Sequence, residues 1–374
     1  MRNLFTGALA VLLAASAASA QIPTRPALKA GADPNDWNAY FDRGVELLKE
    51  DARDADEMFA WAARLDPSRA EPLYGRYVAF HMRDVRRFEE YLNDNQRVLR
   101  EPGVMRADSL YFESVVRNPF VHRGLIALAY DQLPGEWGND SFTRAFLEYA
   151  RGEIDAAARD LSAHVRRSPG DFRARHALAM SLTHLRRYDE ARVELDSVLA
   201  ALRRRDERRV ARVYESKEML LYSLGLLHLV QNRQDQAREA FAQAVVEDAS
   251  QWYAHRGLAL ALVSAGHPAD ALPEYRTAIE LAGPDNPILL SEYGKALYSA
   301  RQYDAAIEQL SHLVRVAPDW ADAWLALGNA NARANRKDAA IEAFNAYLAR
   351  APRSDADMAG RVRAQVEQLR AAGS

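Results

Sequence analysis

Cysteine is absent from all 374 residues of the chain. Its absence excludes disulfide bonds, a thiolate nucleophile, and the zinc, iron–sulfur or c-type haem sites that depend on cysteine. An excess of charge of either sign is missing too, because 49 lysines and arginines stand against 52 aspartates and glutamates. Dedicated nucleic-acid binding needs a basic surface, so we expect no nucleic-acid partner. Without disulfides, the fold has to be held together by packing.

The short motifs of common catalytic and metal sites are also missing. The sequence contains no His-Glu-x-x-His pair, no Gly-x-Ser-x-Gly elbow and no Gly-x-x-x-x-Gly-Lys loop. None of its 9 histidines lies four residues from another histidine, the spacing that places two imidazoles on one helix face. We therefore expect no enzyme activity, no catalytic residue, no metal site and no cofactor.

The beginning of the sequence combines a basic residue with a short apolar stretch. Arg2 precedes Leu4 to Ala17, which is uncharged and mostly apolar, and small residues follow at Ala18-Ser19-Ala20. This pattern predicts a cleaved signal peptide. The alternative is a membrane anchor, but the strongly apolar part is too short to span a bilayer. We expect a periplasmic or secreted bacterial protein with no stable membrane insertion after signal cleavage.

One unit recurs in the C-terminal part of the sequence, between Pro287 and Pro352. In the later copy, Leu327-Gly328 is followed by Ala340, Phe344 and Pro352. Residues of similar kinds lie 34 positions earlier, at Gly294, Ala306, Leu310 and Pro318. Small residues let two helices cross closely, a large apolar residue fills the groove between units, and proline ends a helix. This spacing resembles the tetratricopeptide repeat, a helix pair that recurs every 34 residues.

The same register extends towards the N-terminus. Further units begin near residues 36, 138, 172, 218 and 252. Within 70–137 the signature small residues are mostly missing, so degenerate repeats and a distinct inserted region are both open there. The interval between the units at 172 and 218 is longer than the others and contains a charged run at 203–209. This run is either a basic loop that grips an acidic partner or, as we favour, a solvated extension of two long helices.

The predicted fold is built from helices throughout. No stretch alternates with period two over a length that indicates a sheet. The last segment carries Met358, Val362, Val366 and Leu369 on one helical face, as suits a helix that covers the end of a repeat stack. We expect an all-α fold, a right-handed superhelical solenoid of about nine tetratricopeptide helix pairs with a C-terminal capping helix. The expected segments are a signal peptide (1–20), a flexible leader (21–35), N-terminal degenerate helical repeats (36–137), repeats (138–205), a charged insertion (206–217), repeats (218–354) and the capping helix (355–374).

The resemblance to tetratricopeptide-repeat proteins implies a concave groove lined by the first helix of each pair, where a peptide or partner protein binds. Helical periodicity places a stripe of residues beside the face that packs inward. The stripe is mixed and cationic towards the C-terminus, and apolar and aromatic towards the middle. The predicted groove residues are Phe142, Phe146, Tyr149, Met180, Met219, Tyr222, Arg256, Lys295, Tyr298, Asn329 and Arg333.

These features together predict a non-enzymatic interaction scaffold for a protein or peptide with an apolar segment and an acidic end. Two other functions are open. One is an envelope assembly factor that acts through self-association or through an outer-membrane complex. The other is an enzyme or carbohydrate-binding protein with a site within 70–137, which would need convergent carboxylates near Tyr111, Glu113 and Trp137.

Overall fold

The computed structural model describes residues 24–93, 102–121, 124–132, 140–207 and 217–371, and within these ranges it contains helices and no strand. The predicted signal peptide lies outside the described residues. The N-terminal part contains α1 (Trp37–Leu47), α2 (Ala52–Leu65), α3 (Glu71–Met82), α4 (Val85–Asn93), α6 (Pro102–Arg117) and α7 (Ile126–Tyr130). None of the described helices combines the length and apolar character that a bilayer-spanning helix requires.

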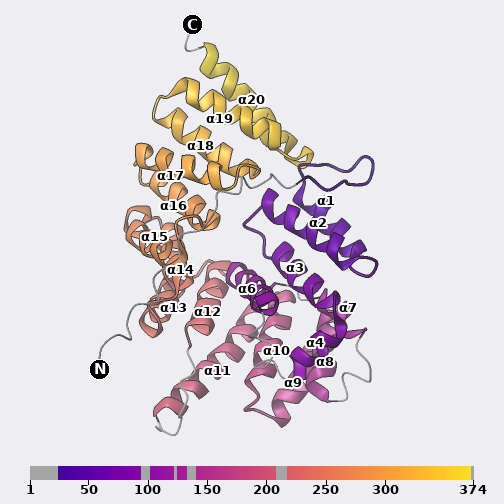
Figure 1. The fold of residues 1–374 in the computed structure, drawn as a ribbon. Coiled ribbons are helices and arrows are strands. Elements are labelled where there is room, and N and C mark those ends of the chain that lie inside the picture. The colour runs from indigo at the N-terminus through magenta and orange to yellow at the C-terminus, as the bar shows by residue number, and fades with distance from the viewer. Residues whose placement is uncertain (1–23, 94–101, 122–123, 133–139, 208–216, 372–374) are drawn as a thin grey trace, which may run out of the picture.

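From α8 onwards the helices follow one another in pairs (Figure 1). The pairs are α8 (Ser141–Ala150) with α9 (Ile154–Arg167), α10 (Phe172–His184) with α11 (Tyr188–Glu207), α12 (Glu218–Val230) with α13 (Gln234–Glu247), α14 (Trp252–Ser264) with α15 (Pro268–Ala282), α16 (Pro287–Ser299) with α17 (Tyr303–Val316), and α18 (Ala321–Arg333) with α19 (Lys337–Arg350). A 3₁₀ turn (Arg353–Asp355) and α20 (Ala356–Ala371) follow. The predicted all-α superhelical solenoid of helix pairs is confirmed.

The second helix of a pair inserts a large apolar side chain between two first helices. Phe241 of α13 is fully buried between Gly225 of α12 and Gly257 of α14. A Cβ atom added at Gly225 or Gly257 would lie 2.5 or 2.3 Å from the Phe241 ring, closer than atoms pack. The same arrangement recurs near the C-terminus, where a Cβ at Gly328 would lie 2.5 Å from Phe344. The close helix crossing predicted from the small residues is present at these positions.

The turn inside each pair is built in the same way from repeat to repeat. In the turn between α10 and α11, the N–H of Arg186 donates to the carbonyl of Thr183 and that of Arg187 to Leu182, at 3.0 and 2.8 Å. These two bonds form a Schellman motif, which ends a helix with one residue in the left-handed region. Positive φ angles occur at the matching turn positions Gly152, Arg186, Asn232, Gly266, Arg301 and Asn335. A repeated turn geometry gives the two helices of each pair the same orientation to each other.

The last helix covers the open end of the stack. Val362 and Val366 of α20 are buried together with Phe344 and Tyr347 of α19. The other face of α20 carries exposed charges such as Arg363. The predicted capping helix is confirmed, with its apolar stripe turned inward and its charged face in water.

The two ends of the superhelix meet. Arg64 of α2 donates to Asp319 at 2.6 Å, and the Asn35 side-chain amide donates to the carbonyls of Ala349 and Ala351 at 3.3 and 3.4 Å. Figure 1 shows α1 and α2 beside the C-terminal helices. The predicted leader over 21–35 is described from residue 24, and its described part lies against both ends of the solenoid.

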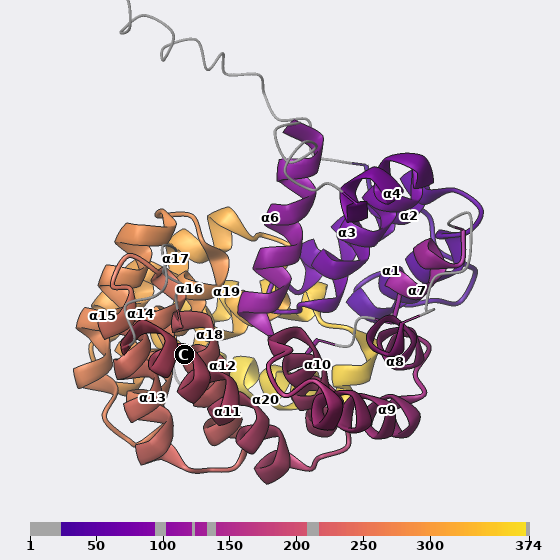
Figure 2. The same ribbon diagram turned by 90° about the horizontal axis from the view of Figure 1, so that it is seen from below.

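One helix in the N-terminal part leaves the regular stack. Helix α6 packs against α3 along one face, and its C-terminal end reaches α12 and α14 (Figure 2). The described helices before and after it, α4 and α7, have 9 and 5 residues, against 13 to 15 for most helices of the later pairs. The described helices within 71–130 therefore do not repeat the regular pairing of the stack. The predicted charged insertion begins within α11, which extends to Glu207, and 208–216 lie outside the described residues.

A buried histidine in α3 predicts a loss of stability in weak acid. His81 is 3% exposed, its ring lies 4.6 Å from Tyr77 and 4.8 Å from Phe88, and burial lowers its pKa from 6.5 to about 4. Between these two values the unfolded chain binds a proton that the folded chain does not. Stability should therefore be complete above pH 6.5 and fall by about 3 kcal/mol as the pH drops to 4.

Urea unfolding at several pH values measures this effect. The His81→Phe variant should lose most of the pH dependence between 6.5 and 4, whereas a variant of the exposed His267, His267→Gln, should keep it. An unchanged pH dependence in His81→Phe would show that another group is responsible.

Candidate functional site

The first helices of neighbouring pairs place equivalent residues side by side. Tyr222 of α12 and Arg256 of α14 occupy the same position in consecutive repeats, and Nη1 of Arg256 donates to the Tyr222 hydroxyl at 2.8 Å. The inner stripe expected from helical periodicity is thus continuous at this point. Three parts of the stripe differ in what covers them.

The C-terminal part of the stripe lines a cavity of about 430 Å³, which we call the C-terminal cavity. Three predicted groove residues contribute to it, Lys295 and Tyr298 from α16 and Asn329 from α18. Leu325 of α18 and Met358 of α20 complete one side of the lining. Residues from two repeats and the capping helix therefore converge on one space.

The lining of the C-terminal cavity combines apolar and charged groups. Lys295 is exposed, and its ammonium nitrogen lies 5.9 Å from the centre of the Trp320 ring. Desolvation raises the pKa of Asp322, while the nearby charge of Lys295 opposes that rise. Tyr298 is half-buried, and its ring is packed 5.6 Å from that of Tyr303. The cavity can accept an apolar side chain and still offer polar contacts at its rim.

The middle of the stripe is covered by the chain itself. Tyr222 is fully buried, Arg256 is 9% exposed, and both contact the carbonyl of Val116 in α6. Met219 is half-buried beside Tyr222 and Tyr253. Sequence reasoning did not foresee this occupant, because α6 carries no repeat signature and its contacts join residues more than 100 positions apart.

The N-terminal part of the stripe belongs largely to the core. Tyr149 and Met180 are 2% and 3% exposed. Phe142 and Phe146 are half-buried and stack on each other, and Phe146 also meets Tyr130 of α7. The structure differs here from the expected open apolar surface, since neighbouring helices cover these side chains. At the other end, Arg333 is exposed and outside the lining of the C-terminal cavity.

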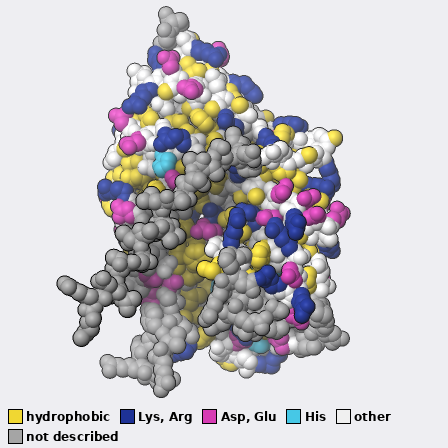
Figure 3. Space-filling model, in the orientation of Figure 1, with side chains coloured by type: hydrophobic (Ala, Val, Ile, Leu, Met, Phe, Trp, Pro, Cys, Tyr) yellow, Lys and Arg dark blue, Asp and Glu magenta, His cyan; other side chains and the backbone are white. Residues whose placement is uncertain are grey.

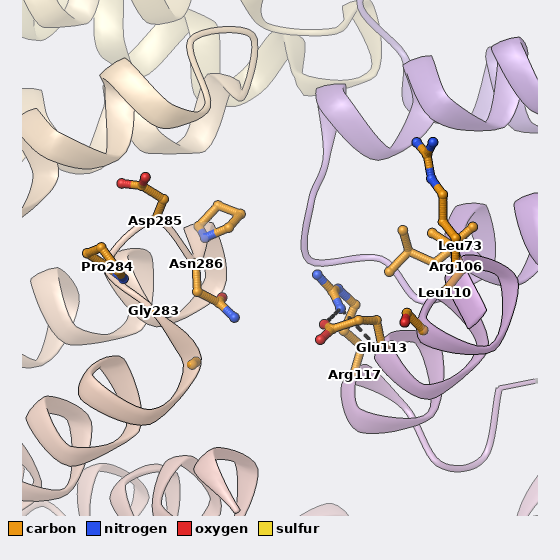
Figure 4. Close-up of a pocket in the computed structure, with 12 residues that line it drawn as sticks. Leu73, Arg106, Leu110, Glu113, Arg117, Gly283, Pro284, Asp285 and Asn286 are labelled. Atoms are coloured by element: carbon orange, nitrogen blue, oxygen red, sulfur yellow. Dashed lines mark hydrogen bonds and ion pairs between the residues drawn. The ribbon is translucent and has the colours of Figure 1, made fainter. Parts of the chain in front are cut away.

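A second cavity, of about 510 Å³, lies between α6 and the turn that joins α15 to α16 (Figure 4). On the α6 side, Glu113 is bound by Arg117 at 2.6 Å. Asp285 lines the opposite wall of the cavity. The carboxylates of Glu113 and Asp285 therefore face each other across the cavity and do not lie together. Tyr111 packs against Tyr77 at a ring distance of 5.2 Å, and Trp137 lies outside the described residues. Among the described residues that line this cavity, Glu113 and Asp285 are not paired as a site for sugar chemistry was expected to need.

A metal site needs several ligand side chains close together. Within the described ranges, no three histidine, aspartate or glutamate side chains gather closely enough to hold an ion.

The repeat match decides the family. The model of the tetratricopeptide repeat matches residues 142–207, 222–287, 256–311 and 292–355, which together make up more than half of the chain. The chain belongs to the tetratricopeptide-repeat family. The matches run from α8 to α19, and they include every predicted groove residue except Met219.

Several solved structures are similar to this chain at low sequence identity. The protein described as "YrrB: a TPR protein with an unusual peptide-binding site" is 19% identical over 55% of this chain and 98% of its own, with a TM-score of 0.43. The Cut9–Hcn1 complex of the APC/C is 14% identical over 87% of this chain and 76% of the matched chain, with a TM-score of 0.45. MamA from Desulfovibrio magneticus RS-1 is 18% identical over 48% and 94%, with a TM-score of 0.41. No curated protein sequence is a significant match.

Proposed function

We propose that this tetratricopeptide-repeat protein is a non-enzymatic interaction scaffold that binds a segment of a partner protein across the C-terminal cavity. The observation that carries the proposal is the convergence of Lys295, Tyr298 and Asn329, from consecutive repeats, on one space that Met358 of the capping helix helps to line. Families of this kind present such concave surfaces for binding. Adaptable methionine and tyrosine side chains suit a surface that closes around a partner.

The chemistry of the cavity indicates what the partner segment carries. Leu325 and Met358 offer an apolar surface for a buried side chain, and Asn329 offers an amide that can bond to a main-chain group. Lys295 is exposed and cationic, so an acidic residue placed near it gains an ion pair. A partner with an apolar side chain next to an acidic one fits this lining best.

The proposal is tested by quantitative capture of partners on the purified protein. The double variant Tyr298→Ala, Asn329→Ala should retain about tenfold less of the specific partner than the wild type, because two contacts at the cavity are removed. The matched control is Tyr188→Ala, Asn345→Ala, which removes the same side-chain types from second helices outside the cavity. Equal capture by the two double variants would exclude the C-terminal cavity as the binding site.

We also propose that residues 1–20 direct export of the protein, on the basis of the basic, apolar and small-residue pattern at its start. An exported scaffold would meet its partners in the periplasm or outside the cell. Intact-mass measurement of the protein purified for the capture experiment tests this proposal. We expect the mass of a chain that lacks residues 1–20. A full-length mass would contradict cleavage after Ala20.

A further inference from the structure

The superhelix closes into a ring through polar contacts between its two ends. Nε and Nη2 of Arg64 in α2 both donate to one carboxylate oxygen of Asp319, at 2.9 and 2.6 Å. The two side chains are 35% and 33% exposed. An ion pair that water reaches to this extent contributes little to stability, because solvent screens the charges and both side chains must be held in one geometry.

The leader adds a strap across the same junction. Asp33 accepts a hydrogen bond from the main-chain N–H of Arg353 at 2.5 Å, and the Arg353 guanidinium donates to the carbonyl of Gly31 at 3.4 Å. The Asn35 side-chain amide donates to two main-chain carbonyls at the end of α19. Water reaches most of these groups and can replace either partner, so each bond adds little. We call these bonds and the ion pair with α2 together the clasp.

No apolar cluster of the described residues crosses the clasp. The buried apolar side chains of the N-terminal helices form one cluster within 28–150, and those of the last repeats form clusters within 252–369. Neighbouring helix pairs of the stack, in contrast, share fully buried side chains such as Phe241. Burial of apolar surface is the main source of stability in such contacts, so the clasp is weaker than the contacts between neighbouring pairs.

The surfaces that meet at the clasp are not closely packed. Asp319 lines two cavities, of about 270 and 310 Å³, and side chains of α2 line both of them as well. Figure 3 shows this face of the molecule hollowed between the C-terminal stack and the N-terminal helices, with charged side chains on the N-terminal side. The two ends can therefore part at the clasp without disrupting a close-packed core.

Like charges from the two ends approach each other beside the clasp. Asp66, directly after α2, and Asp322, in the first turn of α18, line the same cavity. Desolvation raises the pKa of Asp322, Lys295 opposes the rise, and the negative charge of Asp66 adds to it. Arg69, on the same side of the clasp as Asp66, opposes the rise least. Opening of the ring would relieve the repulsion between the two aspartates.

The clasp also adjoins the C-terminal cavity. Asp322 lines both that cavity and the cavity of about 310 Å³ at the clasp. Away from the clasp, the N-terminal helices are held to the middle repeats by the fully buried Val116 of α6. Movement at the clasp would therefore change the surroundings of the C-terminal cavity while the rest of the ring keeps its contacts.

We propose that the ring opens and closes at the clasp, and that opening widens the entrance of the C-terminal cavity. The two ends separate as the clasp bonds exchange for bonds to water, and the ring closes again when they re-form. The role of this gate in partner binding rests on the proposed function, whereas the movement at the clasp does not depend on it.

Pulsed electron–electron double resonance between two spin labels measures the opening. The chain has no cysteine, so Asp54→Cys in α2 and Glu342→Cys in α19 carry the only labels. Asp33→Ala with Asp319→Ala removes two acceptors of the clasp. In this clasp variant the ratio of long to short label distances should rise about tenfold.

The matched control removes two aspartates from ion pairs inside the stack. Asp189→Ala with Asp304→Ala breaks the pairs with Arg233 and Arg336, and it should leave the label distances as in the wild type. Both double variants should keep the wild-type circular dichroism spectrum, since only partly exposed side chains are changed. Identical distance distributions in the clasp variant and the wild type would overturn the proposal.

The reaction rate of a thiol inside the C-terminal cavity measures the gate. Ala326→Cys places the thiol in the lining. A maleimide attached to a short peptide should react with it about tenfold faster in the clasp variant, because the rate follows the population of the open form. The small reagent N-ethylmaleimide should react at similar rates with and without the clasp. Asn345→Cys, exposed on α19 outside the cavity, should react equally in both backgrounds.

Equal rates of the peptide reagent at Ala326→Cys in the two backgrounds would show that the clasp does not gate the cavity. These rates need no binding partner, so they stay as expected even if the capture experiment rules out the C-terminal cavity as the partner site. Failure of the gate and failure of the proposed function are thus distinguished.

Discussion

Replacing Phe241 with alanine should lower the free energy of unfolding by about 3–5 kcal/mol. The ring is fully buried, and glycines from two consecutive first helices, Gly225 and Gly257, face it directly. Neither glycine has a side chain that could move into the space left by the ring. The cavity would remain largely unfilled, and the cost of such a cavity adds to the lost burial of the ring.

The loss should also spread beyond one repeat. Phe241 joins α12 and α14 across α13, and a solenoid owes much of its stability to contacts between neighbouring units. Hydrogen exchange should therefore become faster in all three helices. Urea unfolding measures the total change.

The control for this substitution lies on the same helix. Val246 is 88% exposed, so Val246→Ala should change stability by no more than about 0.5 kcal/mol. The free energies of unfolding of Phe241→Ala and Val246→Ala should differ clearly. A difference of less than about 1 kcal/mol would show that the ring is not the wedge between repeats that the glycine contacts indicate.

Replacing Glu292 with alanine should destabilise the protein by about 3 kcal/mol, towards the lower end for buried ion pairs. Glu292 and Arg256 are 2.8 Å apart, and their side chains are 19% and 11% exposed. Removal of the carboxylate leaves the Arg256 guanidinium in the interior with only neutral partners, the Tyr222 hydroxyl and the Val116 carbonyl. The remaining exposure of Glu292 lets water replace part of the lost contact, which limits the effect.

A double variant and an exposed pair separate the charge effect from packing. Glu292→Leu with Arg256→Met removes both charges and should recover most of the stability that Glu292→Ala loses. Asp304→Ala breaks a pair with Arg336 whose side chains are 83% and 51% exposed, and it should cost less than about 1 kcal/mol. Thermal unfolding of the three variants is the measurement. A loss in Glu292→Ala as small as that in Asp304→Ala would contradict the role assigned to the buried pair.

Helical spacing predicts some of the residues that line the C-terminal cavity, but not all of them. Lys295, Tyr298 and Asn329 were expected to share one surface from their helical spacing, and they line one cavity. Met358 was assigned to the apolar stripe of the capping helix, and its place in that cavity could not be read from spacing. It lies in the first turn of α20, where it packs against the cluster that α20 forms with α19, and the angle between the two helices decides which cavity it lines.

The aromatic residues nearer the N-terminus illustrate the opposite case. Periodicity places Tyr149 and Tyr222 on the inner stripe, but it does not say whether another part of the chain covers that stripe. Tyr149 packs against His184 of the next repeat, and Tyr222 is covered by α6. A residue on the inner face of a solenoid is open only if the superhelix leaves space in front of it.

The sequence by itself determined the helix pairs, their recurrence and the capping helix, because small residues, wedge residues and turns at fixed spacing act between near neighbours along the chain. The tertiary structure alone decided that the two ends of the solenoid meet, through Arg64 and Asp319, and that α6 crosses to Tyr222 and Arg256. These contacts join residues far apart in the chain and carry no periodic signal. They depend on the rotation of each repeat against the next, summed over the whole stack. This sum cannot be read from the sequence of a single repeat.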